Sequence, residues 1–494
     1  MSPFTRFRAP VSGRSLRRQQ IALVVLALLS LAGYVWMAFW FPLSPFYRQV
    51  PLADVRDFTP SLAAGAAYGL LLLVLYGLYW LAFRLTQQGG LRLRMSFVWG
   101  TAVLFSLPLL FTYPFNATDV FRYLIHGRIT AFYHTNPYLT PPDAFPQDPF
   151  LPLAGEWAGE TSPYGPVWEM GAAAIAALTG NDLYAGLLLF KLGGLATFLL
   201  CSWLLWLLLA DAPPVRRVGL TLLWAWNPAL LLVFVVDAHN DALMLLWLLL
   251  GYWLWRRGYA VMGLIAMFLA VLTKPIALLP LAFFGLAIWR SLPGRAARVR
   301  FLMITAVTTL LLTFFTFLPF GSPFLLAARL AREASHYPGF SPVTLILLFI
   351  PEWGALTMER YTLIVNLGRL LFLLLAGWLT WRAWHGRNPL RAAADIFFAY
   401  LLTTPAFRIW YAAWPFPWLL LDEGGQKEAG SPTVVSYRLR VGLWFLLTTQ
   451  LSVIIYGHLH HYRLGEASFP THFIGVPFTF GLPFVLAWQR KRSG

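Results

Sequence analysis

Long apolar segments follow one another along almost the whole chain, and only short polar breaks separate them. An apolar run of about 20 residues is long enough to cross a bilayer as a helix. We expect membrane spans near 21–40, 61–83, 95–112, 183–210, 218–236, 241–255, 259–272, 275–290, 301–320, 361–384, 392–408, 409–421, 441–457 and 474–488. The short pieces can be broken helices or tight hairpins, so the pattern predicts an all-α, polytopic membrane protein with about 12–14 transmembrane helices.

The composition supports a membrane protein. Of the 494 residues, 59% are hydrophobic and only 12% are charged, whereas about 25% of a typical soluble domain is charged. So little charge cannot cover a water-facing surface, which excludes a soluble enzyme, a disordered chain and a coiled coil. The apolar runs are continuous and do not alternate with polar residues, which excludes an outer-membrane barrel. The one cysteine, Cys201, lies in an apolar run and cannot form an internal disulfide.

The net charge of +17 has a topological explanation. Lys and Arg collect in the cytoplasmic loops of membrane proteins. If the N-terminus is cytoplasmic and the spans alternate, most basic residues fall inside and most acidic residues fall outside. This predicts basic cytoplasmic tails at 1–20 and 489–494, a single transmembrane domain at 21–488, and no binding of nucleic acid. The first apolar run, from Ile21, has no small-residue cleavage site, so we interpret it as an anchor.

Five outer segments follow from this orientation: 41–60, 113–182, 237–241, 321–360 and 458–473. Segment 113–182 is the longest and is rich in Pro, Tyr, Trp and Asp. We therefore expect an ordered, partly helical cap there, which is the main extracytoplasmic loop. Residues 323–334 have the pattern of an amphipathic helix lying on the outer surface.

A polar cluster opens this cap. Asp119, Arg122, Tyr123 and His126 lie at helical spacing on one face, and Arg128 follows. A carboxylate placed beside a hydroxyl, an imidazole and a guanidinium can take a proton from a sugar hydroxyl. The alternative is that Asp119 is only a charge favoured by the helix dipole.

Two proline-aromatic motifs follow in the same segment. One is Asn136-Pro137-Tyr138, and the other is S-P-Y-G-P at 162–166, which contains Tyr164. Prolines fix the backbone, and aromatic rings offer apolar faces on which a sugar can stack. A rigid structural loop would have the same composition, and both interpretations stay open.

A third polar cluster, Asp237, His239, Asn240 and Asp241, separates two very apolar runs. Such residues are unfavourable near a membrane unless they line a polar cavity. A metal ion held by Asp237, His239 and Asp241 is conceivable, but no ligand spacing requires it.

A further group of histidines lies in the last outer segment, at His458, His460 and His461, where we favour a solvated loop over a metal site.

Two cations lie in otherwise apolar stretches. Lys274 stands in T-K-P at 273–275, and Arg408 follows a proline at 405. Ionisable residues inside a membrane are functional candidates by default, and a phosphate at the membrane boundary would suit both. The alternative is a side chain that snorkels to the interface. For Lys191 and Arg369, which are also embedded, snorkelling or a structural pair explains the residue equally well.

These clusters, in this order, resemble the polyprenol-phosphate-sugar-dependent glycosyltransferases of the C superfamily (GT-C). The closest likeness is to the bacterial polyprenol-phosphomannose-dependent α-mannosyltransferases. The motifs that carry the resemblance are D-V-F-R-Y-L-I-H-G-R-I-T-A-F-Y-H-T-N-P-Y at 119–138, S-P-Y-G-P at 162–166, N-P at 227–228, H-N-D-A-L at 239–243 and T-K-P at 273–275.

The resemblance implies a GT-C-like fold with an outer loop cap and a function. A hexose, most readily mannose, would move with inversion from a polyprenyl-phosphate donor in the lipid bilayer to a glycan or glycolipid acceptor. The reaction would take place on the outer side of the bacterial cytoplasmic membrane, without a metal or other cofactor. The family's general base maps onto Asp119. By charge and depth we assign the donor phosphate to Lys274 and Arg408. The predicted substrate-binding residues are Arg122, Tyr123, His126, Arg128, Asn136, Tyr138, Tyr164, His239, Asn240 and Asp241.

One feature departs from the family. In many relatives the catalytic loop is the first outer loop, whereas here 41–60 precedes it, so Asp54 and Asp57 are rival bases.

Two other functions compete with transfer. A transporter or flippase of lipid-linked saccharides needs a cavity with cations but no base, and a membrane scaffold needs neither. The sequence has no nucleotide-binding signature, which disfavours a nucleotide-sugar enzyme.

Overall fold

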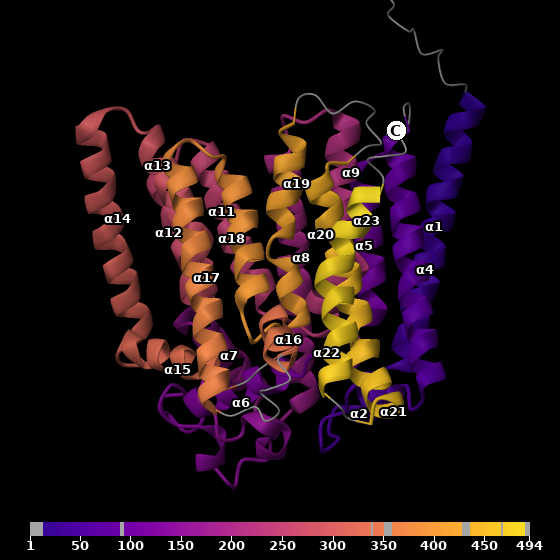
Figure 1. The fold of residues 1–494 in the computed structure, drawn as a ribbon, viewed down its shortest axis with the longest axis horizontal. Helices are drawn as coiled ribbons and strands as arrows, with labels where there is room; N and C mark the ends of the chain where they lie inside the picture. The colour runs from indigo at the N-terminus through magenta and orange to yellow at the C-terminus, as the bar shows by residue number, and fades with distance from the viewer. Residues whose placement is uncertain are drawn as a thin grey trace, which may run out of the picture.

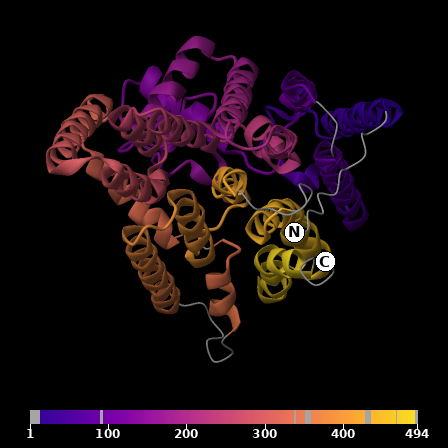
Figure 2. The same ribbon diagram turned by 90° about the horizontal axis from the view of Figure 1, so that it is seen from above.

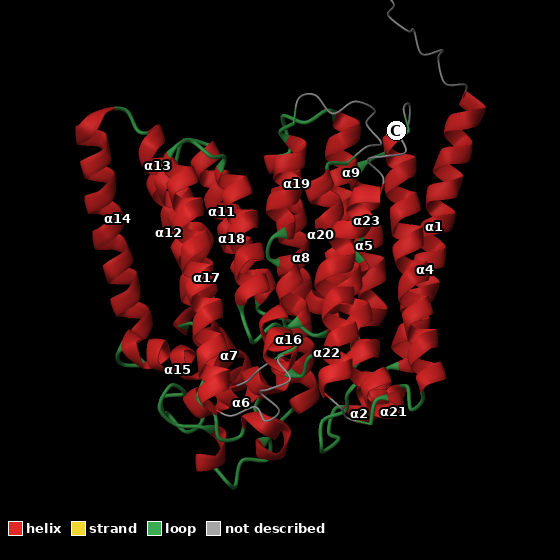
Figure 3. Cartoon of the chain, in the orientation of Figure 1, coloured by secondary structure: helices red, strands yellow, loops and turns green. Residues whose placement is uncertain are grey.

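The structure, a computed structural model, describes residues 13–88, 93–336, 339–349, 358–426, 435–465 and 468–489. The ends of the predicted tails, 1–12 and 490–494, lie outside the described residues. The described chain is helical throughout and contains no strand (Figure 3). A helix satisfies its backbone hydrogen bonds internally, so it is the element that an apolar chain can place in a bilayer. The all-α prediction is confirmed.

The helices follow the predicted apolar segments closely. In the first half of the chain they are α1 (Gly13–Trp40), α2 (Leu43–Phe46), α3 (Val55–Phe58), α4 (Leu62–Gln87), α5 (Met95–Leu110), α6 (Asp119–Ala131), α7 (Pro166–Thr179), α8 (Leu183–Leu208), α9 (Pro214–Ala225), α10 (Pro228–Leu231) and α11 (Asp241–Arg256). In the second half they are α12 (Ala260–Thr273), α13 (Leu278–Ser291), α14 (Gly294–Phe317), α15 (Pro323–His336), α16 (Pro342–Phe349), α17 (Met358–Trp384), α18 (Pro389–Thr403), α19 (Phe416–Gly424), α20 (Tyr437–Val453), α21 (His460–Arg463), α22 (Ser468–Val476) and α23 (Leu482–Gln489).

Among the described residues, seven helical stretches are each long and apolar enough to cross a membrane. They are 17–40, 62–87, 183–208, 294–317, 359–384, 437–463 and 469–488. An eighth span results if α9 and the segment 228–236, which meet at an angle of 44°, are counted together. The other predicted spans are helices of 9 to 16 residues, namely α5, α11, α12, α13, α18 and α19.

Two of the breaks between short helices contain prolines. Lys274 ends α12, and Pro275 follows it before α13 begins. Residues 404–415, between α18 and α19, contain only a short turn of 3₁₀ helix at Ile409–Ala413. A proline lacks a backbone N–H donor and disfavours a helical conformation in the residue before it. Each break therefore leaves backbone groups without a helical hydrogen-bond partner. The pieces expected within 392–421 are therefore two separate helices, with Arg408 in the break.

The segments predicted to lie outside gather at one end of the bundle. Figure 1 shows α2, α6, α7, α15, α16 and α21 at this end, which we call the cap end. The connection between α13 and α14 and the start of α9 lie at the opposite end (Figure 1). Segment 113–182 is partly helical, as expected, and it contains α6, α7 and two short 3₁₀ helices at Pro142–Ala144 and Leu151–Trp157.

The first and last parts of the chain lie side by side. Helix α4 contacts α20 and the π-helical turn Ile454–Leu459, and α3 contacts the same turn. Figure 2, seen along the helices, shows the indigo N-terminal and yellow C-terminal segments next to each other, with α14 at the opposite edge. This arrangement brings the outer segment 41–60 to the same wall as the residues after α20.

Candidate active site

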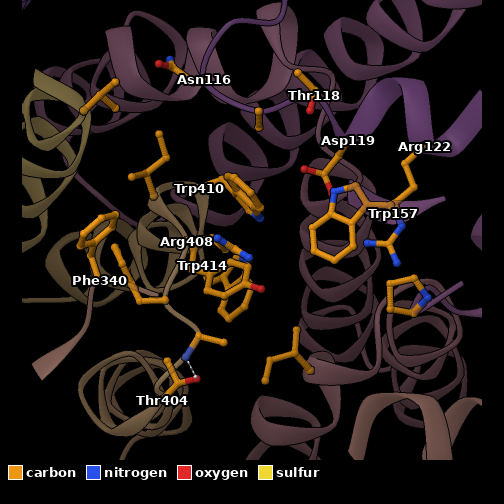
Figure 4. A pocket seen from close by; sticks show the side chains of 18 of the residues that line it. Asn116, Thr118, Asp119, Arg122, Trp157, Phe340, Thr404, Arg408, Trp410 and Trp414 are labelled. Carbon is orange, nitrogen blue, oxygen red and sulfur yellow. Dashed lines mark hydrogen bonds between the residues drawn. The ribbon is translucent and has the colours of Figure 1, made fainter. Parts of the chain in front are cut away.

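A cavity of about 960 Å³ opens at the cap end. Its walls come from stretches that are far apart in the sequence: 54–56, 115–122, 156–164, 274–279, 400–414 and 453–460. Figure 4 shows labelled residues from several of these stretches facing one another across the space. The cavity is large enough for a sugar and a phosphate group, and it is lined by aromatic side chains together with a similar number of polar and charged ones.

Asp119 is the first residue of α6 and lies on the wall of this cavity. The Tyr164 hydroxyl donates a hydrogen bond of 2.7 Å to Asp119 Oδ1. Within the described chain, Asp119 Oδ2 accepts no hydrogen bond. One oxygen is therefore held in place, and the other is free to meet a substrate hydroxyl.

The surroundings keep the Asp119 carboxyl ionised. Burial raises its pKa, but the interaction with His239, the hydrogen bond from Tyr164 and the positive charges of Arg122 and Lys274 outweigh burial and hold the pKa below 3.8. Burial lowers the pKa of His239 itself to about 4, so this imidazole is neutral near pH 7. The hydrogen bond from Tyr164 and the charges of Arg122 and Lys274 lower the pKa of Asp119 whether or not His239 is protonated.

The loop that carries Tyr164 is fixed on all sides. Gly165 N donates to Thr273 O at 3.0 Å, and a Cβ atom on Gly165 would lie 2.1 Å from Leu272 O. Only glycine allows this contact, which joins the S-P-Y-G-P motif to the T-K-P motif. The Tyr138 hydroxyl donates to Tyr164 O at 2.8 Å.

A buried acid completes this support. Ser162 Oγ donates to Glu169 Oε1 at 2.5 Å and accepts a hydrogen bond from Tyr164 N at 3.2 Å. Burial raises the pKa of Glu169 to about 7. The chain of contacts from Glu169 through Ser162 to Tyr164 sets the position of the hydroxyl that holds Asp119.

Arg122 stands one helical turn after Asp119 and also lines the cavity. Its guanidinium lies 4.4 Å from the ring centroid of Trp157 and 5.6 Å from that of Tyr164. Arg122 Nη2 donates to Thr161 O at 3.3 Å. The residue thus places positive charge beside Asp119 and positions the half-buried Trp157 indole on the cavity wall.

Lys274 lines the cavity but is already paired. Its Nζ lies 2.8 Å from Asp241 Oδ2 and 2.9 Å from Oδ1, and it donates to Asn240 Oδ1 at 3.2 Å. Trp414 Nε1 also donates to Asp241. Because an ammonium has three donors, these contacts use the donor capacity of Lys274.

Arg408 differs from Lys274 because it has no acidic partner. It lies in the break before α19, half-buried on the cavity wall, and no carboxylate of the described residues is within ion-pair distance of its guanidinium. Figure 4 shows Arg408 between Trp410 and Trp414, pointing into the cavity, with Asp119 and Trp157 on the facing wall. An unpaired guanidinium among aromatic rings is suited to a phosphate.

The family model described as "Alpha-(1->6)-mannopyranosyltransferase, N-terminal domain" matches residues 20–290, which is more than half of the chain. The chain belongs to this alpha-(1->6)-mannopyranosyltransferase family. The match includes Asp119, Tyr164 and Lys274, and it ends before the wall that contains Arg408.

Two relatives show how far the similarity extends. Alpha-(1->6)-mannopyranosyltransferase A of Mycobacterium tuberculosis is 26% identical over 334 residues, which are 64% of this chain and 63% of the relative. Alpha-(1->6)-mannopyranosyltransferase B of Corynebacterium glutamicum is 28% identical over 212 residues, which are 39% of this chain and 34% of the relative. The alignment thus covers less than two thirds of either relative. No solved structure was found to match the chain.

In this mannopyranosyltransferase-family chain, the predicted site residues divide into two groups. Asp119, Arg122, Tyr164, Lys274 and Arg408 line the cavity. The others do not line it, and all except the half-buried Asn136 are buried: Tyr123, His126, Arg128, Asn136, Tyr138, His239, Asn240 and Asp241. For this second group the structure shows supporting contacts in place of direct exposure to the cavity.

Two buried residues connect the walls. His239 stacks on Trp410, with ring centroids 4.1 Å apart, and its Nδ1 lies 3.4 Å from the Tyr123 hydroxyl and 3.7 Å from Asp241 Oδ2. The Tyr123 ring packs edge-on against Tyr164 at 5.0 Å. His239 and Tyr123 therefore join the aromatic walls around Trp410 and Tyr164 from behind.

Three predicted binding residues have structural partners. Arg128 Nε pairs with the buried Asp148 at 2.9 Å, and Asn136 Nδ2 donates to Phe320 O at 2.5 Å. His126 Nε2 lies 3.3 Å from Glu160 O, and burial together with the nearby Arg122 holds the pKa of His126 well below its ordinary value. The contacts of Arg128 and His126 lie within segment 113–182, and that of Asn136 joins this segment to the residues after α14.

The rival bases are engaged in a helix cap. Asp54 accepts a hydrogen bond from Arg56 N at 2.6 Å, and its carboxylate also pairs with the Arg56 guanidinium at 2.6 Å. Asp57 Oδ2 accepts from Asp54 N at 2.7 Å. Asp54 lines the cavity and Asp57 does not. The capping box and Arg56 engage both oxygens of Asp54, and Asp57 lies outside the cavity, which favours Asp119 over both rivals.

The remaining embedded and clustered residues have local roles. Lys191 donates to Thr112 O at 2.9 Å and to Val236 O, and Arg369 donates to Asn366 Oδ1 at 3.2 Å. His458 Nε2 lies 2.7 Å from Thr59 Oγ1, and His460 Nδ1 lies 2.8 Å from Thr471 Oγ1. Among the described residues, no three His, Cys, Asp or Glu side chains gather where they could hold a metal ion.

Sequence reasoning missed several residues on the cavity wall. They are Asn116, Arg56, Trp157, Trp410, Trp414, Phe340 and His460. The tryptophans gave no usable signal, because the chain has 23 of them and most lie in apolar runs. Arg56 gave a weak signal as a basic residue in a predicted outer segment, where acidic residues prevail.

Proposed function

We propose that this protein is a membrane mannosyltransferase that moves mannose from a polyprenyl-phosphate donor to a glycan or glycolipid acceptor. The observation that carries the proposal is one aromatic-lined cavity that holds an acid with a free oxygen and an unpaired guanidinium. The names of the relatives, which are alpha-(1->6)-mannopyranosyltransferases, support mannose as the sugar. Family membership supports transfer over transport or scaffolding.

The proposed step is a single displacement. The acceptor hydroxyl oxygen attacks the anomeric carbon and forms the new glycosidic bond, while the bond from that carbon to the phosphate oxygen breaks. The proton of the hydroxyl moves to Asp119 Oδ2, and the polyprenyl phosphate leaves with both electrons of the broken bond. Attack from the face opposite the leaving group inverts the configuration. Arg408 stabilises the phosphate as its negative charge grows.

Lys274 supports the same site in a different way. Its ammonium is bound to Asp241 and Asn240, so it adds positive charge to the wall without a free donor for the phosphate. Breaking a buried pair of this kind costs about 3–5 kcal/mol, because the remaining charge is left without a partner. We therefore assign Lys274 and Asp241 chiefly to the architecture of the wall, and the leaving phosphate to Arg408.

The orientation of the site follows from the charge pattern. The cavity opens at the cap end, where the predicted outer segments gather (Figure 1). Lys- and Arg-rich connections favour the cytoplasmic side for the opposite end. We propose that both termini are cytoplasmic, that the cavity faces the extracytoplasmic side, and that the membrane is a bacterial cytoplasmic membrane.

The test is transfer from radiolabelled polyprenyl-phosphate mannose to an octyl α-mannoside, with the full chain reconstituted in vesicles. We expect Asp119→Asn to lower the turnover by about 10³-fold, because a positioned general base contributes roughly 10²–10⁴-fold. Binding of labelled donor should change little.

The matched control is Asp211→Asn, which removes an exposed acid between α8 and α9 that pairs with Arg256 at 2.7 Å. It should keep the wild-type rate. Equal transfer by wild type and Asp119→Asn would remove Asp119 from the mechanism. Movement of the intact lipid-linked sugar across the vesicle membrane, without transfer, would support the transporter instead.

A further inference from the structure

We propose that Asp54, Arg56 and Asn116 form the subsite for the acceptor saccharide, at the part of the cavity next to α3. This inference rests on the proposed function and adds to it a location and a chemical class for the acceptor. The subsite would take a neutral, polyhydroxylated ligand. The proposal comes from the contacts that hold the Arg56 side chain.

The Arg56 guanidinium is fixed before any ligand binds. Its Nε and Nη2 donate to Asp54 Oδ2 at 3.0 and 2.6 Å, and Asp54 is itself held by the capping box of α3. The Arg56 side chain also packs over Gly457, since a Cβ atom there would lie 3.7 Å from Arg56 Cδ. Arg56 Nη1 has no hydrogen-bond partner within the part of the chain that the structure describes. Its two N–H groups are therefore available and pre-oriented.

This wall leads directly to Asp119. Ala53 N donates to the Tyr113 hydroxyl at 3.1 Å, which ties the loop before α3 to the segment before α6. Residues 54–56 and 115–119 all line the cavity. Asn116 Nδ2 lies 3.4 Å from Gln450 Oε1, on the helix that continues toward Gly457. An acceptor held by Arg56 and Asn116 would lie along this continuous wall, with Asp119 at its end.

The charges distinguish this subsite from the phosphate site. Asp54 and Arg56 form a pair whose net charge is zero, and their side chains are 45% and 39% exposed. Arg408, in contrast, has no acid partner among the described residues. An unpaired cation favours an anion, whereas a pre-paired carboxylate and guanidinium offer donors and acceptors to neutral hydroxyl groups. The stacked rings of Phe340 and Tyr456, 3.6 Å apart, add an apolar surface to the same cavity.

The test is a two-substrate kinetic analysis of the full chain in nanodiscs, with polyprenyl-phosphate mannose and octyl α-mannoside. We expect Arg56→Ala to raise the KM for the octyl α-mannoside about tenfold, while the KM for the donor changes less than twofold. Arg56→Lys keeps the charge but loses the planar fork, so it should raise the acceptor KM by a similar factor. Binding of labelled donor to each variant reports whether the donor side of the protein is intact.

The matched control is Arg48→Ala. Arg48 is an exposed arginine of the same outer segment that lies over the Tyr47 ring and does not line the cavity. It should leave both KM values unchanged. An Arg56→Ala variant with normal donor binding and an unchanged acceptor KM would overturn the inference while the proposed function stands.

The charge of the acceptor provides a second test. If Arg56→Ala impairs an acceptor that bears a phosphate group and leaves octyl α-mannoside unaffected, the subsite recognises an anion, and the neutral-ligand inference is wrong. If the wild type transfers mannose to neither acceptor, the proposed function fails before the subsite comes into question.

Discussion

Two parts of the cavity wall each contain an aspartate and an arginine, but the two residues are paired in one part and separated in the other. Near α3, Asp54 and Arg56 bind each other at 2.6 Å. Between α6 and the break before α19, Asp119 and Arg408 stand on facing walls (Figure 4), and neither has an ion-pair partner among the described residues. The first acid is also the cap of a helix, whereas the second begins a helix and accepts only the Tyr164 hydroxyl.

The difference shows what makes an acid available for chemistry. A carboxylate whose oxygens are already bound by a backbone amide and a guanidinium has little capacity left for a substrate proton. A carboxylate with one bound and one free oxygen is both oriented and open. Position at the start of a helix and proximity to a cavity are common to Asp54 and Asp119, so neither property alone identifies a base.

After the loss expected for Asp119→Asn, the next largest effect should come from Arg408, the cation without an acidic partner. We expect Arg408→Ala to lower kcat/KM for the donor roughly 10–100-fold, because a hydrogen bond to a charged group contributes about 1.5–3 kcal/mol. Steady-state kinetics with varied polyprenyl-phosphate mannose provide the measurement. Arg463→Ala, which changes an exposed arginine of α21 outside the cavity, should keep the wild-type value. Loss of the same size in both variants would contradict a phosphate-binding role for Arg408.

A smaller effect should follow from freeing the bound oxygen of Asp119. We expect Tyr164→Phe to lower kcat about tenfold, since it removes a hydrogen bond to a charged group. The hydrogen bond from Tyr164 lowers the pKa of Asp119, so its removal raises that pKa. A base works only when deprotonated, and activity is lost as the pH falls through its pKa. The acidic limb of the pH–rate profile should therefore move to higher pH.

The control for this profile is Tyr133→Phe. The Tyr133 hydroxyl donates to a different acid, Asp148, at 2.9 Å. The Tyr133→Phe variant should leave the acidic limb of the pH–rate profile in its wild-type position. An unchanged limb in Tyr164→Phe would show that Asp119 is not the group that titrates.

The smallest effect should come from the paired acid. We expect Asp54→Asn to raise the acceptor KM no more than about fivefold, because a half-exposed ion pair contributes roughly 0.2–1 kcal/mol. Asparagine can also cap α3, so the fold should tolerate the change. A fall of kcat by 10³-fold at saturating acceptor would identify Asp54 as the base and reverse the comparison.

Much of the fold could be predicted, but less of the site. The apolar runs predicted nearly every long helix, and the composition of 113–182 predicted an ordered cap. Helix α1, however, begins at Gly13 within the predicted tail, because its polar first turns continue the helix beyond the apolar run. Asp119, Tyr164 and Arg408 were predicted and lie together, whereas His239 and Asp241 were expected at the cavity and lie behind its wall.

The sequence by itself determined the class of the protein, its cap and the polar residues worth considering. These follow from local composition and helical spacing, which are properties of short stretches of chain. Only the tertiary structure decided which polar groups are already satisfied. Lys274 and Asp241 are 33 positions apart, and Asp119 and Tyr164 are 45 apart. Whether a charge is paired or free depends on such distant contacts, and that distinction separates Arg408 from Lys274 and Asp119 from Asp54.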